Sequence, residues 1–185
     1  MRLTIAIPTV NRDYCVRRAV ESALAQTSPD VEIIVSNNGS TDATREILDG
    51  YSDPRLRVFH HAPTMPVAAH ANLIMEYVSG ELVVALSDDD YLEPTFAERV
   101  LDLFARHPEL SFAYTRAWTH VRDFALPSPP GPEVEETLPF FQRYFAGERH
   151  VFWCACVTRT EALRRLCPIP PDVQIGDMYI WTQLA

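Results

Sequence analysis

Short apolar runs alternate with segments of helical periodicity over the first 115 residues. The runs are four or five residues long and rich in branched side chains, as is typical of buried strands; they lie at 3–7, 31–35, 56–59, 82–86 and 111–115. Between them the spacing predicts helices at 14–25, from Ser40 or Thr41 to Leu48, at 66–77 and at 94–107. This alternation predicts an α/β fold with a mostly parallel central sheet and helices on both faces.

The pattern weakens after residue 122. The proline-rich stretch 126–132 is expected to be an extended connection. Farther along, the pattern predicts a helix at 137–146, a strand at 150–158, a short helix at 160–166 and a last helix at 177–185. We expect one structural domain made of two halves, 1–115 and 116–185.

Composition narrows the classes of function. All 16 basic residues are arginine, against 25 acidic residues, and the net charge is -9. The absence of lysine excludes a Walker A loop and a lysine Schiff base. The acidic balance argues against a nucleic-acid partner, because phosphate contacts need a basic surface. No apolar run approaches the ~20 residues that span a bilayer, and the first residues lead straight into a strand pattern without a secretory signal.

The four cysteines are too few and too scattered for a disulfide scaffold. We therefore expect free, partly buried thiols and a cytoplasmic location, with peripheral attachment to the inner face of a membrane left open.

Polar clusters follow three of the predicted strands. They read Pro-Thr-Val-Asn at 8–11, Asn-Asn-Gly-Ser at 37–40 and Ser-Asp-Asp-Asp at 87–90. Ligands of parallel α/β sheets bind beyond the carboxyl ends of the strands. The three clusters are therefore expected to meet and form the functional site.

Several readings of these residues stay open at this point. The adjacent carboxylates Asp88, Asp89 and Asp90 repel one another, which fits either a solvated loop or a Mg²⁺ or Mn²⁺ ion shared with substrate phosphates. The Asn37-Asn38 amides suit a plain turn or a nucleotide base. Asp177, which follows Gly176, suits a helix cap or a general base.

Four segments together resemble the family 2 glycosyltransferases. Residues 5–12 (IAIPTVNR) are similar to the family's opening strand, and residues 35–42 (VSNNGSTD) to its V-x-D-D-G-S-T-D motif. Ala71-Asn72 with Ser79-Gly80-Glu81 resembles the helix before the metal strand, and residues 86–94 (LSDDDYLEP) resemble L-D-x-D-D-x-L-x-P. Beyond residue 115 the resemblance rests mainly on Gly176-Asp177, where the family tends to show Glu-Asp. The resemblance implies a Rossmann-like A-type nucleotide-sugar-binding fold.

The resemblance also implies a reaction and a set of roles. The reaction is transfer of a sugar, with inversion, from a nucleotide diphosphate to a hydroxyl of a glycan, lipid-linked or small-molecule acceptor, with Mn²⁺ or Mg²⁺ as cofactor. The implied nucleotide-binding residues are Pro8, Thr9, Asn11, Asn38 and Asn72 together with Asp88 at the ribose. The implied metal residues are Asp89, as principal ligand, and Asp90, and the implied general base is Asp177.

The chain departs from the family pattern at two places. Ser87 replaces the first acid of the D-x-D motif, which leaves two carboxylates for a metal, and Asn37 and Asn38 replace two acids. The amide oxygen of Asn38 can still meet a uracil N–H, so UDP is favoured as donor nucleotide, with dTDP and GDP open.

Two other functions stay open beside the transferase. One is a nucleotide-sugar-binding module with little activity alone; the other is a metal-dependent phosphoryl-transfer enzyme. Compared with the family the chain is expected to be short at its C-terminal end, which makes donor binding the firmer expectation. The donor sugar, the acceptor and the oligomeric state cannot be predicted from these motifs.

Overall fold

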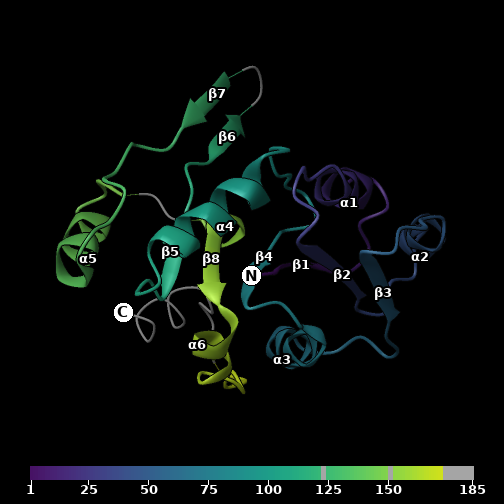
Figure 1. Ribbon diagram of the computed structural model, residues 1–185. Coiled ribbons are helices and arrows are strands. Elements are labelled where there is room, and N and C mark those ends of the chain that lie inside the picture. The colour runs from purple at the N-terminus through teal and green to yellow at the C-terminus, as the bar shows by residue number, and fades with distance from the viewer. Residues whose placement is uncertain (122–123, 150–151, 173–185) are drawn as a thin grey trace.

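The central sheet has six strands in the order β3-β2-β1-β4-β8-β5 (Figure 1). The structure, a computed structural model, describes residues 1–121, 124–149 and 152–172. Four neighbouring strands run parallel: β1 (Leu3–Thr9), β2 (Val31–Asn37), β3 (Leu56–His60) and β4 (Leu82–Ala85). Strand β8 (Cys156–Arg159) lies antiparallel between β4 and β5 (Phe112–Tyr114). The predicted fold class is confirmed.

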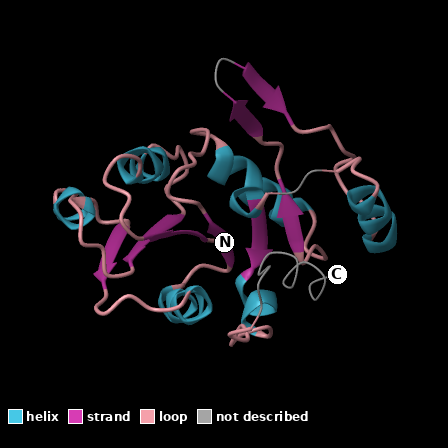
Figure 2. Cartoon of the chain, turned by 180° about the vertical axis from the view of Figure 1, so that it is seen from behind, coloured by secondary structure: helices cyan, strands magenta, loops and turns pink. Residues whose placement is uncertain are grey.

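Helices cover both faces of this sheet, as Figures 1 and 2 show. One face carries α1 (Val16–Leu24), α2 (Thr44–Asp49) and α4 (Phe96–Arg106); the other carries α3 (Val67–Tyr77) and α6 (Thr160–Arg164). Helix α5 (Thr137–Phe145) packs at the β5 end through Phe140, whose ring contacts Phe112 and Tyr114. In the described segments, no helix combines the length and the apolar character needed to cross a membrane.

Alternation along the strands divides the core into two layers. Leu3, Ile5 and Ile7 of β1 pack in the cluster that includes α1, α2 and α4. Ile34 of β2 and Val83 of β4 point into the opposite cluster. Because helices cover both faces, β2 is buried at all seven positions. This double burial explains why Val31, Ile33, Ile34 and Val35 are apolar on both faces of the strand.

A buried polar network ties β4 to β1 and β2. Glu32 on β2 accepts hydrogen bonds from Thr4 Oγ1 (2.7 Å) and Ser79 N (3.0 Å), and Arg57 Nη1 lies 3.1 Å from it. Burial raises the pKa of Glu32, but these hydrogen bonds bring it below its usual value. Gly80 N donates to Thr4 Oγ1, and a Cβ at Gly80 would lie only 2.8 Å from that oxygen. Glycine is therefore required where the α3–β4 turn touches β1.

Two predictions for the second half of the chain are wrong in detail. Part of the stretch 126–132 forms β7 (Phe124–Pro127), which pairs antiparallel with β6 (Trp118–Val121) in a separate hairpin. The strand predicted at 150–158 begins only at Cys156, after a 3₁₀ turn at Trp153–Ala155. Among the described residues 152–159, those from Cys156 onward have register partners on β4 or β5, which sets the start of the strand.

Helix α2 begins at Thr44, later than the predicted Ser40 or Thr41. The Ser40 N–H and hydroxyl both donate to Asn37 Oδ1, at 3.1 and 2.6 Å. Asp42 Oδ1 accepts from Thr44 N (3.0 Å). The loop side chains therefore bond within the loop before the helix starts. The predicted helix at 177–185 lies outside the described residues.

Candidate functional site

Three loops meet at the carboxyl edge of the sheet. They follow β1, β2 and β4, which are neighbours in the strand order. Backbone hydrogen bonds extend the strand pairing into the loops: Asn38 N donates to Thr9 O (2.8 Å), and Leu86 N donates to Ala6 O (2.9 Å). The structure thus brings the three polar clusters of the sequence to one edge, where ligands of such sheets bind.

Asn11 joins the first two of these loops. Its backbone lies in the left-handed region (φ 54°), which asparagine tolerates better than most residues. Asn11 N donates to Ser40 Oγ (2.8 Å), and Asn11 Oδ1 accepts from Thr41 N (2.8 Å). The residue therefore holds the β2–α2 loop against the end of β1. Its contact with a nucleotide stays a prediction.

Asp88 is the buried acid of the acidic loop, and Arg12 is its partner. Arg12 Nε lies 3.4 Å from Asp88 Oδ1, and the Asp88 side chain is 11% exposed. Burial raises the pKa of Asp88, while the Thr9 hydroxyl and the Arg12 charge oppose that rise. Sequence analysis assigned no role to Arg12, although the IAIPTVNR segment ends on it.

Thr9 brings an unsatisfied polar atom to the same place. The residue is 3% exposed. Within the described residues, Thr9 Oγ1 has no hydrogen bond of ordinary geometry. A buried hydroxyl without a partner is costly unless a ligand or water satisfies it. Pro8 precedes Thr9 on β1, and Asn37 is the register partner of Thr9 on β2, so both lie at the same part of the edge.

The two asparagines predicted to bind the base are largely engaged with backbone. Asn38 donates from Nδ2 to Met65 O and accepts at Oδ1 from Met65 N, both at 2.9 Å. Asn72 makes the same pair of bonds with Ile169, at 3.1 and 2.7 Å. Each amide keeps one N–H for a ligand. Asn38 thus fixes the loop before α3, and Asn72 fixes the segment after α6.

Asp89 and Asp90 are more accessible than Asp88. Asp89 is exposed, and Asp90 is partly exposed. Among the described residues, no three His, Cys, Asp or Glu side chains are placed together to hold a metal ion. Mg²⁺ and similar hard cations need no such cage when one or two carboxylates share them with substrate phosphates. The oxygens of Asp89 and Asp90 suit that arrangement, and the metal role stays a prediction.

A cavity of about 800 Å³ opens beside the acidic loop. Asp89 and Asp90 line it together with α4 residues, residues 115–118 and Cys154. Burial, and then a hydrogen bond with Asp90, raises the pKa of Cys154 to about 12. The thiol is therefore neutral near pH 7, and it lines the cavity together with Asp90. All four cysteines of the chain are free. The cavity has the size of a small-molecule site.

A histidine pair lies under the β2 loop, and sequence analysis treated its members singly. Ser36 Oγ is 2.9 Å from His61 Nε2 and 2.8 Å from His70 Nε2. Ser36 and His70 are buried. Burial, and then the neighbouring His61, lowers the pKa of His70 to about 4. Ser36 thus joins the two rings beneath the site, and the buried His70 is neutral near pH 7.

This histidine network should make the fold sensitive to mild acid. Folded His70 stays neutral down to about pH 4, whereas the unfolded chain takes up a proton near pH 6.5. The stability present above pH 6.5 is therefore lost as the pH falls toward 4, by up to about 3 kcal/mol. Urea unfolding at pH 7 and 4.5 measures the loss, which should be smaller in His70→Gln. Equal losses in both proteins would contradict the assignment.

Asp177, the predicted general base, lies outside the described residues, as does its neighbour Gly176. The structure does place the segment that leads toward it. Residues 168–172 follow α6, and the Asn72–Ile169 hydrogen bonds hold them against α3. The role of Asp177 stays a prediction.

Curated relatives match 61% of the chain. The chain is 35% identical over 115 residues to a chondroitin synthase of Pasteurella multocida and to one of Escherichia coli. These matches cover 61% of the chain but only 12% and 17% of the two relatives. The chain therefore spans a small part of these longer proteins.

Solved structures share the fold over the whole chain. The structure of Staphylococcus aureus TarS 1-349 in complex with UDP has a TM-score of 0.81 at 17% identity. A mannosyltransferase, PcManGT from Pyrobaculum calidifontis, in complex with GDP-Man and Mn²⁺, has a TM-score of 0.74 at 19% identity. Both matches cover 100% of this chain, and 55% and 52% of the solved chains. At these identities the likeness shows the fold.

The family assignment rests on the sequence itself. The model of "Glycosyl transferase family 2" matches residues 4–166, from the start of β1 to the end of α6. The match contains all three loops of the carboxyl edge, including Arg12 and the acidic loop. This match confirms the family resemblance that was based on the four motifs. The chain belongs to glycosyl transferase family 2.

Proposed function

We propose that the protein transfers a sugar from a nucleotide diphosphate donor, with UDP favoured, to a hydroxyl of an acceptor, with inversion at the anomeric carbon. One observation carries the proposal: three polar loops converge at the carboxyl edge, where the Arg12–Asp88 pair stands beside the exposed Asp89. Family membership favours this function over metal-dependent phosphoryl transfer. The acceptor is a glycan, a lipid-linked sugar or a small molecule.

The nucleotide would lie along the β1 and β2 loops. Pro8 and Thr9 would line the base pocket, where the unsatisfied Thr9 hydroxyl supports a ligand contact. The remaining amide N–H groups of Asn38 and Asn72 would face the base. Asp88, held in place by Arg12, would accept a hydrogen bond from the ribose.

The diphosphate would lie at the acidic loop. Mn²⁺ or Mg²⁺, held by Asp89 with Asp90, would neutralise the charge that grows on the leaving diphosphate. Cys154, a neutral thiol, lines the same cavity as Asp90. The chain has no lysine, so other cationic help must come from arginine.

The base that activates the acceptor must lie across the sugar from the leaving group, because inversion requires attack from the opposite side. Asp177 would accept the proton of the acceptor hydroxyl. It belongs to a different segment from the acidic loop, which is compatible with that geometry.

Proteins with a similar fold have been solved with different nucleotides or nucleotide sugars bound. TarS 1-349 has been solved with UDP and with UDP-GlcNAc, and PcManGT with GDP-Man and Mn²⁺. Fold alone therefore does not select the base. In this chain Asn38 Oδ1 already accepts from Met65 N, so an added uracil N–H would share that oxygen.

Calorimetric titration of the protein with UDP, dTDP and GDP, with and without Mn²⁺, tests the proposal. We expect UDP to bind best and only with Mn²⁺. If none of the three nucleotides binds with metal present, the proposed donor site is wrong. If UDP-sugars bind but no acceptor in a broad panel turns over, the chain is a nucleotide-sugar-binding module.

A further inference from the structure

The cavity beside the acidic loop is lined by three arginines, and none of them forms an ion pair with an acid among the described residues. Arg18, Arg99 and Arg116 all line it. Elsewhere in the described structure arginines commonly form ion pairs with acids; those that do are Arg12, Arg45, Arg55, Arg57, Arg106, Arg143, Arg149 and Arg165. In a chain of net charge -9, three arginines that share one cavity and have no acid partner among the described residues offer a place for an outside anion, beside the carboxylates Asp89, Asp90 and Glu93 that line the same cavity.

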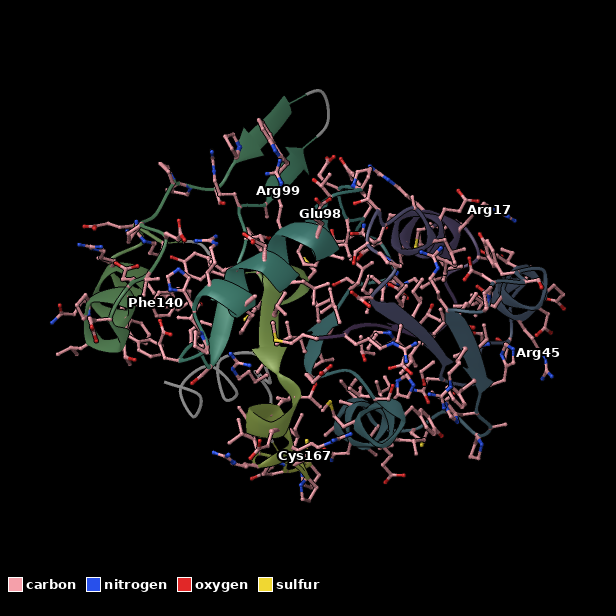
Figure 3. The ribbon with its side chains drawn as sticks, viewed as in Figure 1. Arg17, Arg45, Glu98, Arg99, Phe140 and Cys167 are labelled. Atoms are coloured by element: carbon pink, nitrogen blue, oxygen red, sulfur yellow. The ribbon has the colours of Figure 1, made fainter. Side chains whose placement is uncertain are left out.

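Each of the three arginines is held differently. The Arg18 guanidinium lies over the Tyr91 ring, 3.8 Å from its centroid. Arg116 Nε donates to Ser128 O (3.1 Å), which fixes the guanidinium and leaves its two terminal nitrogens to a ligand. The Arg99 side chain makes no hydrogen bond or ion pair with the described residues, and Figure 3 shows it on the side of α4 nearest the β6–β7 hairpin.

Ser128 makes this wall of the cavity rigid. Its N–H donates to Ala117 O (2.8 Å), and its hydroxyl accepts from Ala117 N (3.1 Å). The backbone beside Arg116 is therefore fixed before any ligand arrives. A site whose donors are held in advance loses less entropy when it binds.

Aromatic rings stand in the same cavity. Trp118 is 57% exposed and Phe152 is 38% exposed, and both line the cavity. Large exposed rings of this kind mark binding surfaces in soluble proteins. An indole ring offers a flat apolar face and a polar N–H, which suits the mixed apolar and hydroxyl surface of a sugar ring. The cavity thus combines a platform for a sugar with donors for an anion.

We propose that this cavity binds the acceptor and that the acceptor is an anionic sugar. Its carboxylate or phosphate would be bound by Arg99 and Arg116, and its ring would lie against Trp118. This inference rests on the proposed function, because Asp89 and Asp90, at one end of the same cavity, would hold the donor's metal. The acceptor hydroxyl would then lie beside the donor sugar.

Matched pairs of ligands test the anionic preference. The probes are a uronic-acid-containing tetrasaccharide with its carboxyl-reduced counterpart, and a sugar 1-phosphate with the free sugar, each titrated with and without UDP and Mn²⁺. We expect at least one charged member to bind about tenfold more tightly than its neutral match. The carboxylate pair and the phosphate pair distinguish the two anions. Equal binding within both pairs, or no binding of any probe, overturns the inference.

Single substitutions show which residues cause the preference for the charged ligand. Arg99→Gln and Arg116→Gln should each weaken the charged probe about tenfold and leave its neutral match unchanged. Trp118→Ala should weaken both members of a pair alike. Arg45→Gln removes an exposed arginine on α2 outside the cavity and should change neither. An effect of Arg45→Gln as large as that of Arg99→Gln would point to overall charge and would overturn the assignment.

Titration with UDP distinguishes a failure of this inference from a failure of the proposed function. UDP affinity in the presence of Mn²⁺ should be unchanged in Arg99→Gln and Arg116→Gln. If it falls as far as the affinity for the charged probe, the arginines belong to the donor site and the inference is wrong. If UDP does not bind the wild-type protein while the charged probe does, the donor assignment fails and the anion site stands.

Discussion

Replacing Asp89 with alanine is expected to lower the Mn²⁺-dependent affinity for UDP by about a hundredfold or more. Asp89 is the exposed carboxylate of the acidic loop, whereas the neighbouring Asp88 is buried and paired with Arg12. Loss of a residue that merely supports a metal ligand costs about 10–100-fold in metal affinity, so loss of the ligand itself should cost at least as much. Calorimetric titration with UDP at saturating Mn²⁺ measures the change.

Asp102→Ala is the matched control for this experiment. Asp102 is also an exposed aspartate, but it lies on α4 in an ion pair with Arg106, outside the cavity. Its loss should leave UDP affinity within about twofold of the wild type, since surface ion pairs contribute little. Wild-type UDP affinity in Asp89→Ala, with Mn²⁺ present, would remove Asp89 from the metal site.

Replacing Asp177 with asparagine is expected to abolish transfer while donor binding is retained. A general base contributes about 10²–10⁴-fold to the rate, and an amide of the same shape cannot accept the proton. UDP binding should stay within about twofold, because the base contacts the acceptor and not the nucleotide. Turnover with a donor and acceptor that the wild-type protein uses, measured beside UDP titration, separates the two effects.

Asp172→Asn is the neighbouring control. Asp172 is an exposed aspartate at the end of the described segment after α6. The Asp172→Asn variant should transfer sugar at the wild-type rate. If Asp177→Asn also turns over at that rate, another group is the base. If it loses donor affinity along with turnover, Asp177 belongs to the nucleotide site.

Local pattern was enough to predict the first half of the fold. The strands β1, β2 and β4 are buried on both faces, so each is mostly apolar and easy to find, although Thr4 and Glu32 interrupt two of them. Their parallel order then places the Asn37 and Asp88 loops at one edge, as predicted. The β6–β7 hairpin escaped prediction because it lies outside the central sheet and each of its strands is only four residues long.

The candidate site was predictable as a location but not in its contacts. The Arg12–Asp88 pair joins residues 76 positions apart, and the Asn72–Ile169 clasp joins residues 97 positions apart. Such contacts depend on how loops pack after the sheet has formed. The Asn38 amide shows the consequence: its residue type suits a base, yet Met65 backbone takes up most of its hydrogen-bonding capacity.

The arginine-lined cavity also allows pH to report which anion it binds. Arginine stays charged in proteins, and among the described residues no histidine, the side chain that ordinarily changes charge between pH 5 and 8, lines the cavity. A phosphate monoester gains its second negative charge near pH 6, whereas a uronic acid is already ionised there. Affinity that rises from pH 5 to 7 would therefore be the signature of a phosphate, and affinity that stays level would be that of a carboxylate.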